Sequence, residues 1–338
     1  MPNKATYLRN AILATIIYYD IFDYPLTLVE IHKYLVNPGR LSNIQGGIGE
    51  IKLSDIIDEL DRLVDPGIIN QKNGFYFLNG RNDLYELRIE RDKISARKWK
   101  KFLRMAKFLA LAPYLRGVFA SGSMTIDNTT EESDFDVLII IRSGRLYTCR
   151  FFLWAVSSFL GIRRKKHQKI APDKLCFNHY ITDDSLYINH ESIFNAQTYI
   201  NLKPVMIKPE ILDQFYVENL WLNNYAYNFH PHNNFVDRNV KPPDTFVILA
   251  KTLEFIFDSF FGNTTERVLK YFQQRRIKSD PVIYEPGGRI VFTDQELEFH
   301  PHSFERIVIE KYRAGLKRFG IVPHIDEEDS GLIPYEVA

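Results

Sequence analysis

The chain has 338 residues, of which 45 % are hydrophobic and 25 % are charged, which is the composition of an ordinary globular protein rather than of a disordered or fibrous one. Its 43 lysines and arginines almost balance its 42 aspartates and glutamates, so the overall charge does not indicate a polyanionic partner. The two cysteines, Cys149 and Cys176, are too few for a disulfide framework or a cysteine-based zinc site.

Residues 1–80 are predicted to form a winged helix-turn-helix-like domain. Helical periodicity and capping residues predict three helices, over residues 8–19, 27–36 and 54–64. Thr27 can cap the second of these, with Glu30 at the capping-box position. Two short strand-like runs follow, at residues 68–71 and 75–78. The dipeptide Asn73-Gly74 between them is a strong hairpin signal, and three helices followed by a hairpin resemble a winged helix.

The third helix of this domain would be the one that enters DNA, yet its sequence is acidic. Residues 52–65 hold five aspartates and glutamates against only Lys52 and Arg62. Such a helix would repel phosphate groups. We therefore do not expect sequence-specific DNA binding, and a protein-contact or regulatory role is favoured.

Residues 81–113 are predicted to form a long connecting helix that Pro113 terminates. Its basic residues are spread around much of the helix: Arg88, Arg91, Lys93, Arg97, Lys98, Lys100, Lys101, Arg104 and Lys107. This spread is typical of a solvated surface. The alternative is a positive wall beside a bound polyphosphate, or an RNA contact.

Residues 114–185 alternate between strand-like and helical patterns. Strands are expected over residues 117–121, 135–141 and 175–181, and a helix over residues 146–160. The most apolar stretch, residues 151–162, is about half the ~20 residues needed to span a bilayer. The N-terminus also lacks the pattern of a secretory signal. The expectation is a cytoplasmic protein with no membrane partner.

Two carboxylates are expected on one face where the second of these strands begins. Because successive strand residues point to opposite faces, Asp134 and Asp136 project to the same side. Two carboxylates so close would repel each other unless a cation lies between them. Mg²⁺ fits, because it binds one or two carboxylates and completes its shell with phosphate oxygens and water.

A phosphate-binding turn is expected at the end of the preceding strand, at Gly122 and Ser123. Glycine lets the backbone approach a ligand closely, and the turn can aim backbone N–H groups at a phosphate. The Ser123 hydroxyl adds a donor. Phosphoryl-group transfer requires a phosphate-binding turn beside metal-binding carboxylates, because that chemistry depends mostly on positioning and charge neutralisation.

Together, Gly122-Ser123, a spacer of ten residues and Asp134-Phe-Asp136 resemble the signature of the DNA polymerase β-like nucleotidyltransferase superfamily. The resemblance implies that residues 114–185 form a nucleotidyltransferase core, a small mixed sheet with flanking helices. It implies two-metal nucleotidyl transfer, with Gly122 and Ser123 at the triphosphate and Asp134 and Asp136 as catalytic metal ligands. The expected cofactor is Mg²⁺ or Mn²⁺ and the expected substrate is a nucleoside triphosphate, ATP before the others. The acceptor is open: a small molecule, a protein or an RNA. The order of domains also resembles a group of bacterial nucleotidyltransferase-domain proteins that begin with a winged helix.

Active members of that superfamily carry a third carboxylate on a later strand, but residues 175–181 contain no acid. Strict alternation places Cys176, Asn178 and Tyr180 on one face, so Asn178 is predicted to occupy the third metal-ligand position. An amide oxygen can bind a metal but cannot accept a proton as a general base. Three hypotheses follow: Asp183 or Asp184 substitutes, His179 acts as the base after a shift of register, or the site binds nucleotide without fast turnover.

A basic patch lies between the expected core helix and the third strand, formed by Arg163, Arg164, Lys165, Lys166 and Lys169. It is either a solvated loop or a contact for polyphosphate or nucleic acid.

Residues 186–338 are predicted to form a mainly helical C-terminal domain, with a hairpin near residues 289–299 and a last helix near residues 304–319. Aromatic residues around residues 246–261 are expected in its core. The histidines of His300-Pro301-His302 are expected to lie in a loop rather than to bind zinc, because no cysteine or clear acid completes the set. The predicted fold class is therefore α+β.

Overall fold

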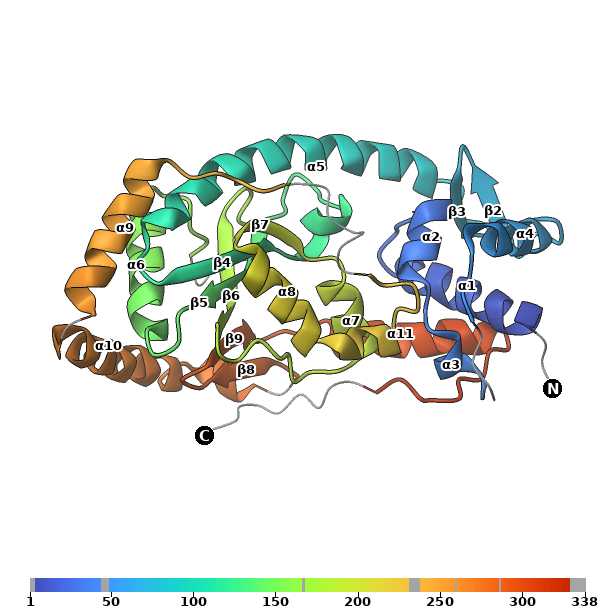
Figure 1. Ribbon diagram of the computed structural model, residues 1–338. Coiled ribbons are helices and arrows are strands. Elements are labelled where there is room, and N and C mark those ends of the chain that lie inside the picture. The colour runs from blue at the N-terminus through green and yellow to red at the C-terminus, as the bar shows by residue number, and fades with distance from the viewer. Residues whose placement is uncertain are drawn as a thin grey trace.

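The structure is a computed structural model, and it describes residues 4–43, 49–165, 168–230, 238–258, 260–285 and 287–328. The fold is mixed α+β, as predicted, with a three-stranded antiparallel sheet and a six-stranded mixed sheet in these residues. Figure 1 shows the smaller sheet near the N-terminus and the larger one in the middle of the molecule.

The N-terminal segment contains the predicted helices and hairpin. Its elements are α1 (Lys4–Asp20), β1 (Leu26–Thr27), α2 (Leu28–Tyr34), α3 (Pro38–Leu41), α4 (Leu53–Val64), β2 (Ile69–Lys72) and β3 (Phe75–Leu78), with strand order β1-β3-β2. The capping box of Thr27 and Glu30 is confirmed at the start of α2. Asn73 and Gly74 both have positive φ, as a two-residue type I′ hairpin requires.

The long helix α5 (Leu84–Ala106) runs along one side of the molecule, from the three-stranded sheet to the six-stranded sheet (Figure 1). It tightens into the 3₁₀ helix η1 (Lys107–Leu111) before Pro113. Two of its basic residues, Arg88 and Lys98, neither lie on a solvated surface nor are available to contact a bound polyphosphate. Arg88 is buried against Glu30, and Lys98 is buried with its Nζ 2.8 Å from Asp173.

The six-stranded sheet has the order β7-β4-β5-β6-β9-β8. Its strands are β4 (Leu115–Ala120), β5 (Phe135–Ile141), β6 (Leu175–Thr182), β7 (Lys203–Ile207), β8 (Arg289–Phe292) and β9 (Glu296–His300). The pair β5–β6 is parallel and the other pairs are antiparallel. Strand β7 and the place of the β8–β9 hairpin in this sheet are not predicted from the sequence.

A separate hydrophobic core covers each face of the sheet. Phe135, Val137 and Ile139 face the core that includes helix α6 (Leu146–Phe159). Leu138 and Ile140 face the other core, which extends to α1 and to the last helix, α11 (Glu305–Arg318). The N-terminal helices, the sheet and α11 are therefore joined by one continuous set of buried side chains.

The remaining helices are α7 (Ile193–Tyr199), α8 (Pro209–Glu218), η3 (Leu220–Asn224), α9 (Asp244–Phe257), α10 (Phe260–Lys278) and η5 (Pro281–Tyr284). The expectation of a core position is wrong for two aromatic residues of this region. Phe255 is 84 % exposed and Phe261 is 75 % exposed, because α9 and α10 turn these side chains away from the sheet. In the part of the chain that the structure describes, no helix is both long and apolar enough to cross a membrane.

Candidate metal and phosphate site

The residues of the predicted signature meet at one edge of the six-stranded sheet. Asp134 and Asp136 lie where β5 begins. Because β4 runs antiparallel to β5, the end of β4 and the turn at Ser121-Gly122 lie at the same edge. The Ser121 N–H donates to the Asp136 carbonyl oxygen at 3.0 Å, which ties the turn directly to the carboxylate strand.

Gly122 is required at its position for two reasons. Its φ of +69° is a left-handed conformation that glycine adopts without strain. A Cβ atom built on it would also lie 2.5 Å from Oδ2 of Asp136. The Gly122 backbone can lie this close to the Asp136 carboxylate because glycine has no side chain. Ser123 follows in the short 3₁₀ helix η2 (Gly122–Ile126) and is exposed.

The carboxylate of Asp134 is paired with Arg164, whose Nη1 lies 2.6 Å from Oδ2. Arg164 is held in place by the backbone carbonyls of Gln168 and Lys169, to which it donates. Of the predicted basic patch, Arg164 is thus the member that reaches the carboxylates. Lys166 lies outside the described residues.

The carboxylate of Asp136 accepts a hydrogen bond from Nδ2 of Asn178 at 3.0 Å. Burial and the negative charge of Asp134 raise the pKa of Asp136 to about 6, although His300, Cys176 and Arg164 act in the opposite direction. A carboxyl group with this pKa is mostly ionised at neutral pH, but its ionisation costs more free energy than that of an ordinary aspartate. A bound cation would lower that cost.

Cys176 also belongs to this site, which the sequence analysis did not predict. Its sulfur and the carboxylate oxygens of Asp134 and Asp136 all lie within 4.8 Å of one another. Burial and the two carboxylates raise the pKa of the thiol, so it is protonated at neutral pH. Asn178 remains the predicted third ligand, because its amide lies beside Asp136 and its oxygen is a harder ligand than a thiol.

The predicted alternation along β6 fails after Asn178. Val137 pairs with Phe177, but the next residue, Leu138, pairs with His179, so Asn178 is an extra residue at a bulge. Tyr180 therefore faces the same core as Val137, opposite to the predicted face. A bulge depends on contacts made across the sheet, and the alternation pattern of one strand does not reveal it.

The structure also shows where the other candidates for a catalytic acid or base lie. Asp183 and Asp184 follow the far end of β6, where both accept hydrogen bonds from Ser143. They form a turn at the opposite edge of the sheet from Asp136. His179 is buried, with Nε2 2.9 Å from Glu296 and Nδ1 3.2 Å from the Tyr199 hydroxyl, so its contacts are with β9 and α7.

Lys98 of α5 fixes the loop between the turn and the carboxylates. Its Nζ donates to the carbonyl oxygens of Glu131 and Ser133 and forms an ion pair with Asp173. Ser133 directly precedes Asp134, so this buried ammonium group sets where β5 begins. The sequence analysis treated Lys98 as one of many basic residues and missed this role.

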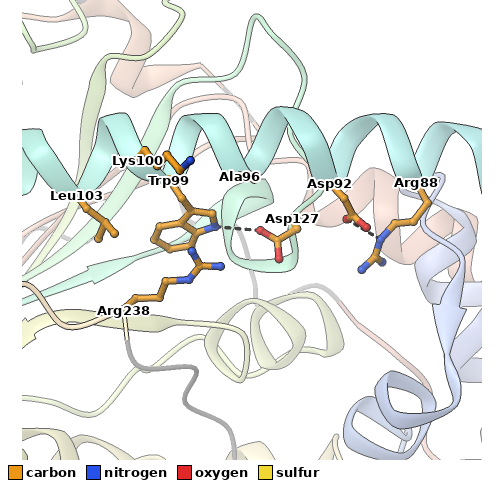
Figure 2. A pocket seen from close by; sticks show the side chains of 8 residues that line it. All are labelled: Arg88, Asp92, Ala96, Trp99, Lys100, Leu103, Asp127 and Arg238. Carbon is orange, nitrogen blue, oxygen red and sulfur yellow. Dashed lines mark hydrogen bonds and ion pairs between the residues drawn. The ribbon is translucent and has the colours of Figure 1, made fainter.

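A pocket of about 330 Å³ lies beside the other end of η2 (Figure 2). It is lined by Arg88, Asp92, Ala96, Trp99, Lys100, Leu103, Asp127 and Arg238. Trp99 donates to Asp127 at 3.0 Å, and the Arg238 guanidinium lies 4.4 Å from the centre of the Trp99 ring. The ring face is thus already covered by Arg238, so the pocket in this form does not offer a free aromatic surface.

Comparison of the chain with protein-family models, with curated proteins and with solved structures finds no match.

Proposed function

We propose that the chain is a nucleotidyltransferase of the DNA polymerase β-like type, which transfers a nucleoside monophosphate from a metal-bound nucleoside triphosphate to an acceptor. The observation that carries the proposal is the close approach of Gly122 to Asp136, 2.5 Å from a Cβ position to a carboxylate oxygen. It supports a site in which backbone N–H groups and metal-binding carboxylates face the same phosphate groups. The order β4-β5-β6, with β4 antiparallel and β6 parallel to β5, suits the small mixed sheet of that superfamily.

Asp134 and Asp136 would hold Mg²⁺ or Mn²⁺, and Asn178 would supply a third ligand through its amide oxygen. The metal would neutralise charge on the triphosphate and lower the pKa of the attacking hydroxyl. In the structure Arg164 compensates the charge of Asp134 at 2.6 Å. A metal on Asp134 would compete with the guanidinium, which could then pair with a phosphate oxygen.

A catalytically silent nucleotide-binding module is the second candidate function. It is favoured by the composition of β6, since Cys176 and Asn178 stand beside Asp136 and the strand contains no acid. Without a carboxylate base, the acceptor hydroxyl depends on the metal alone for its activation. This candidate predicts tight binding of a metal–nucleotide complex with very slow turnover.

We also propose that the N-terminal segment is a winged helix that contacts protein. The arrangement of α1, α2 and α4 with the antiparallel order β1-β3-β2 supports this assignment. Helix α4 exposes Asp58, Asp61 and Asp65, and its buried Glu59 pairs with Arg62. An exposed acidic helix favours a basic protein surface over DNA as the partner.

The proposal is tested by incubating the full chain with Mg²⁺, an extract of host cells and each of the four α-³²P-labelled NTPs in turn. If the protein transfers a nucleotide, the assay should show a labelled acceptor with the wild type and none with the Asp136→Asn variant. Binding of the labelled nucleotide without transfer identifies the silent module. Absence of both contradicts the two candidate functions together.

A further inference from the structure

A second group of side chains that can bind a metal lies on the next two strands of the sheet after β5, on β6 and β9, and has no part in the proposed transfer reaction. It contains His179 of β6, His190 from the segment before α7, and Glu296 and Glu298 of β9. The ligand atoms of His179, Glu296 and Glu298 all lie within 4.8 Å of one another. Unlike an exposed acidic cluster, this group is enclosed: the side chain of Glu298 is 1 % exposed and that of His179 is 5 % exposed.

One pair of atoms in this cluster is incompletely satisfied. Oε2 of Glu298 and Nε2 of His190 are both shielded from solvent and lie 3.3 Å apart. Within the described part of the chain, neither atom makes a hydrogen bond of ordinary geometry. Buried polar atoms are nearly always satisfied, and an ion bound beside this carboxylate oxygen and imidazole nitrogen would satisfy both, because 3.3 Å is a normal separation of two ligand atoms on one metal.

The other atoms of these residues are already oriented. Oε1 of Glu298 accepts a hydrogen bond from Nδ1 of His300 at 2.8 Å, which leaves Oε2 free to bind an ion. The Tyr199 hydroxyl lies 3.2 Å from Nδ1 of His179. With the proton on Nδ1, this contact leaves Nε2 of His179 as the ligand atom, as second-sphere partners of metal-bound histidines commonly do.

The charges around the cluster match a divalent cation. Three buried or nearly buried carboxylates, Glu296, Glu298 and Glu305, surround one guanidinium, that of Arg289. Glu296 and Glu298 contact the imidazoles of His179, His190 and His300. Where these imidazoles are neutral, a divalent cation would supply positive charge to the buried carboxylates, and buried charges are very costly unless they are paired.

A single ion bound at ~2.1 Å keeps its ligand atoms at most ~4.2 Å apart. The ligand atoms of His179, Glu296 and Glu298 already lie within 4.8 Å of one another. His190 reaches the group through Glu298, whose Oε2 lies 3.3 Å from its Nε2.

We propose that His179, His190, Glu296 and Glu298 bind one divalent transition-metal ion, such as Zn²⁺, which fastens the β8–β9 hairpin to the rest of the sheet. Two imidazole nitrogens and two carboxylates suit the ions from Mn²⁺ to Zn²⁺ better than Mg²⁺. The ion joins β6 and the segment that follows it before α7 to β9, which lies more than 100 residues further along the chain. The β6–β9 pairing extends over only three residue pairs, from His179↔Glu298 to Ile181↔Glu296, so this junction gains most from such a link.

The test uses the full chain, stripped with a chelator and then reconstituted with Co²⁺ as a spectroscopic probe. In the Asp136→Asn background, which lacks the proposed Asp134–Asp136 metal site, we expect one Co²⁺ per chain by elemental analysis, a visible absorption band of a site with nitrogen and oxygen ligands, and a melting temperature several degrees higher than that of the stripped protein. Glu298→Gln and His190→Ala should each weaken Co²⁺ binding at least tenfold. The exposed residues Glu310 and His324 provide matched controls, and Glu310→Gln and His324→Ala should bind as the wild type does.

Asp136→Asn separates this site from the proposed nucleotide site, because it should keep both the Co²⁺ band and the melting-temperature shift. If Glu298→Gln fails to fold, Glu296→Gln replaces it, because Glu296 is less buried. The melting-temperature shift of the wild type on Co²⁺ binding can be measured without any variant. Less than one equivalent of Co²⁺ in the wild type would overturn the proposal. So would Co²⁺ binding that survives both ligand substitutions, or binding that is lost in Asp136→Asn.

Discussion

The α-carbon of Gly122 faces the carboxylate of Asp136 so closely that an added methyl group would lie 2.5 Å from Oδ2. These residues are separated by 13 others in the sequence and are brought together by the antiparallel pairing of β4 with β5. The contact couples the proposed phosphate turn to the proposed metal ligands, so that a change at either one alters both.

Gly122→Ala is therefore expected to abolish binding of a metal–nucleotide complex and to lower the free energy of unfolding. The left-handed φ alone costs about 1 kcal/mol and the steric conflict adds to it, for a total of about 1–3 kcal/mol. Gly144→Ala is a matched control, since Gly144 has a φ of +71° with no atom within 4 Å of its Cβ position. Urea unfolding and calorimetric titration should show a smaller loss of stability and unchanged binding for the control. Equal effects of the two substitutions would contradict the role given to the contact.

Binding of Mn²⁺ at Asp134 and Asp136 is expected to depend on pH, because burial and Asp134 raise the pKa of Asp136 to about 6. A metal competes with the proton, so affinity should fall by up to tenfold for each pH unit below about 6 and level off above it. The signal of free Mn²⁺ in electron paramagnetic resonance, measured from pH 5 to 8, gives this curve. An affinity that does not change over this range would show that Asp136 does not bind the ion.

The same raised pKa has an effect on stability that can be measured without metal. The folded state holds the proton of Asp136 more tightly than the unfolded state, whose pKa is near 3.8. This group therefore makes the protein less stable as the pH rises from about 4 to about 6, and the loss is complete above that range. Asp136→Asn should remove this component from the pH dependence of chemical unfolding. Superimposable wild-type and variant curves would contradict the assignment.

Arg164→Gln is expected to separate the two functions of the Arg164 side chain. Removal of a cation 2.6 Å from Asp134 should raise the affinity for free Mn²⁺ severalfold, because the metal no longer competes with the guanidinium. The affinity for the metal–nucleotide complex should fall, because a partner of the phosphate is lost. Arg142→Gln is the matched control, since Arg142 pairs with the partly exposed Asp258 at 2.8 Å. A fall in both affinities for Arg164→Gln would show that Arg164 does not compete with the metal.

Lys98→Met is expected to destabilise the fold by about 2–3 kcal/mol, because two backbone carbonyls and Asp173 lose a buried charged partner. Lys93→Met, on the exposed side of the same helix, should change stability by less than about 0.5 kcal/mol. Thermal unfolding of the two variants gives the comparison. Equal stabilities would mean that Lys98 does not anchor the loop before Asp134.

The sequence predicts most local elements of this protein because their determinants are local. The Thr27–Glu30 capping box and the Asn73-Gly74 turn each specify a structure within a few residues, and both are present. Strand β5 is predicted with its exact bounds because a run of large apolar residues is buried on both faces.

What the sequence does not predict depends on partners that are distant in the chain. The bulge at Asn178 lies in the β5–β6 pairing, directly before the residues of β6 that also pair with β9, and β9 lies more than 100 residues away. The contact of Arg164 with Asp134 and the burial of Lys98 likewise require the assembled sheet. The sequence does predict Gly122, Asp134 and Asp136 as one group, because a known spacing connects them.

The most direct test of the proposed function is calorimetric titration of the full chain with Mn²⁺ and a non-hydrolysable ATP analogue. We predict one nucleotide site in the wild type, no detectable binding in Asp136→Asn, and dependence of the wild-type affinity on Mn²⁺. Binding of the analogue by Asp136→Asn with wild-type affinity would contradict the proposed site. So would the absence of binding by the wild type when the titration is repeated with non-hydrolysable analogues of all four NTPs.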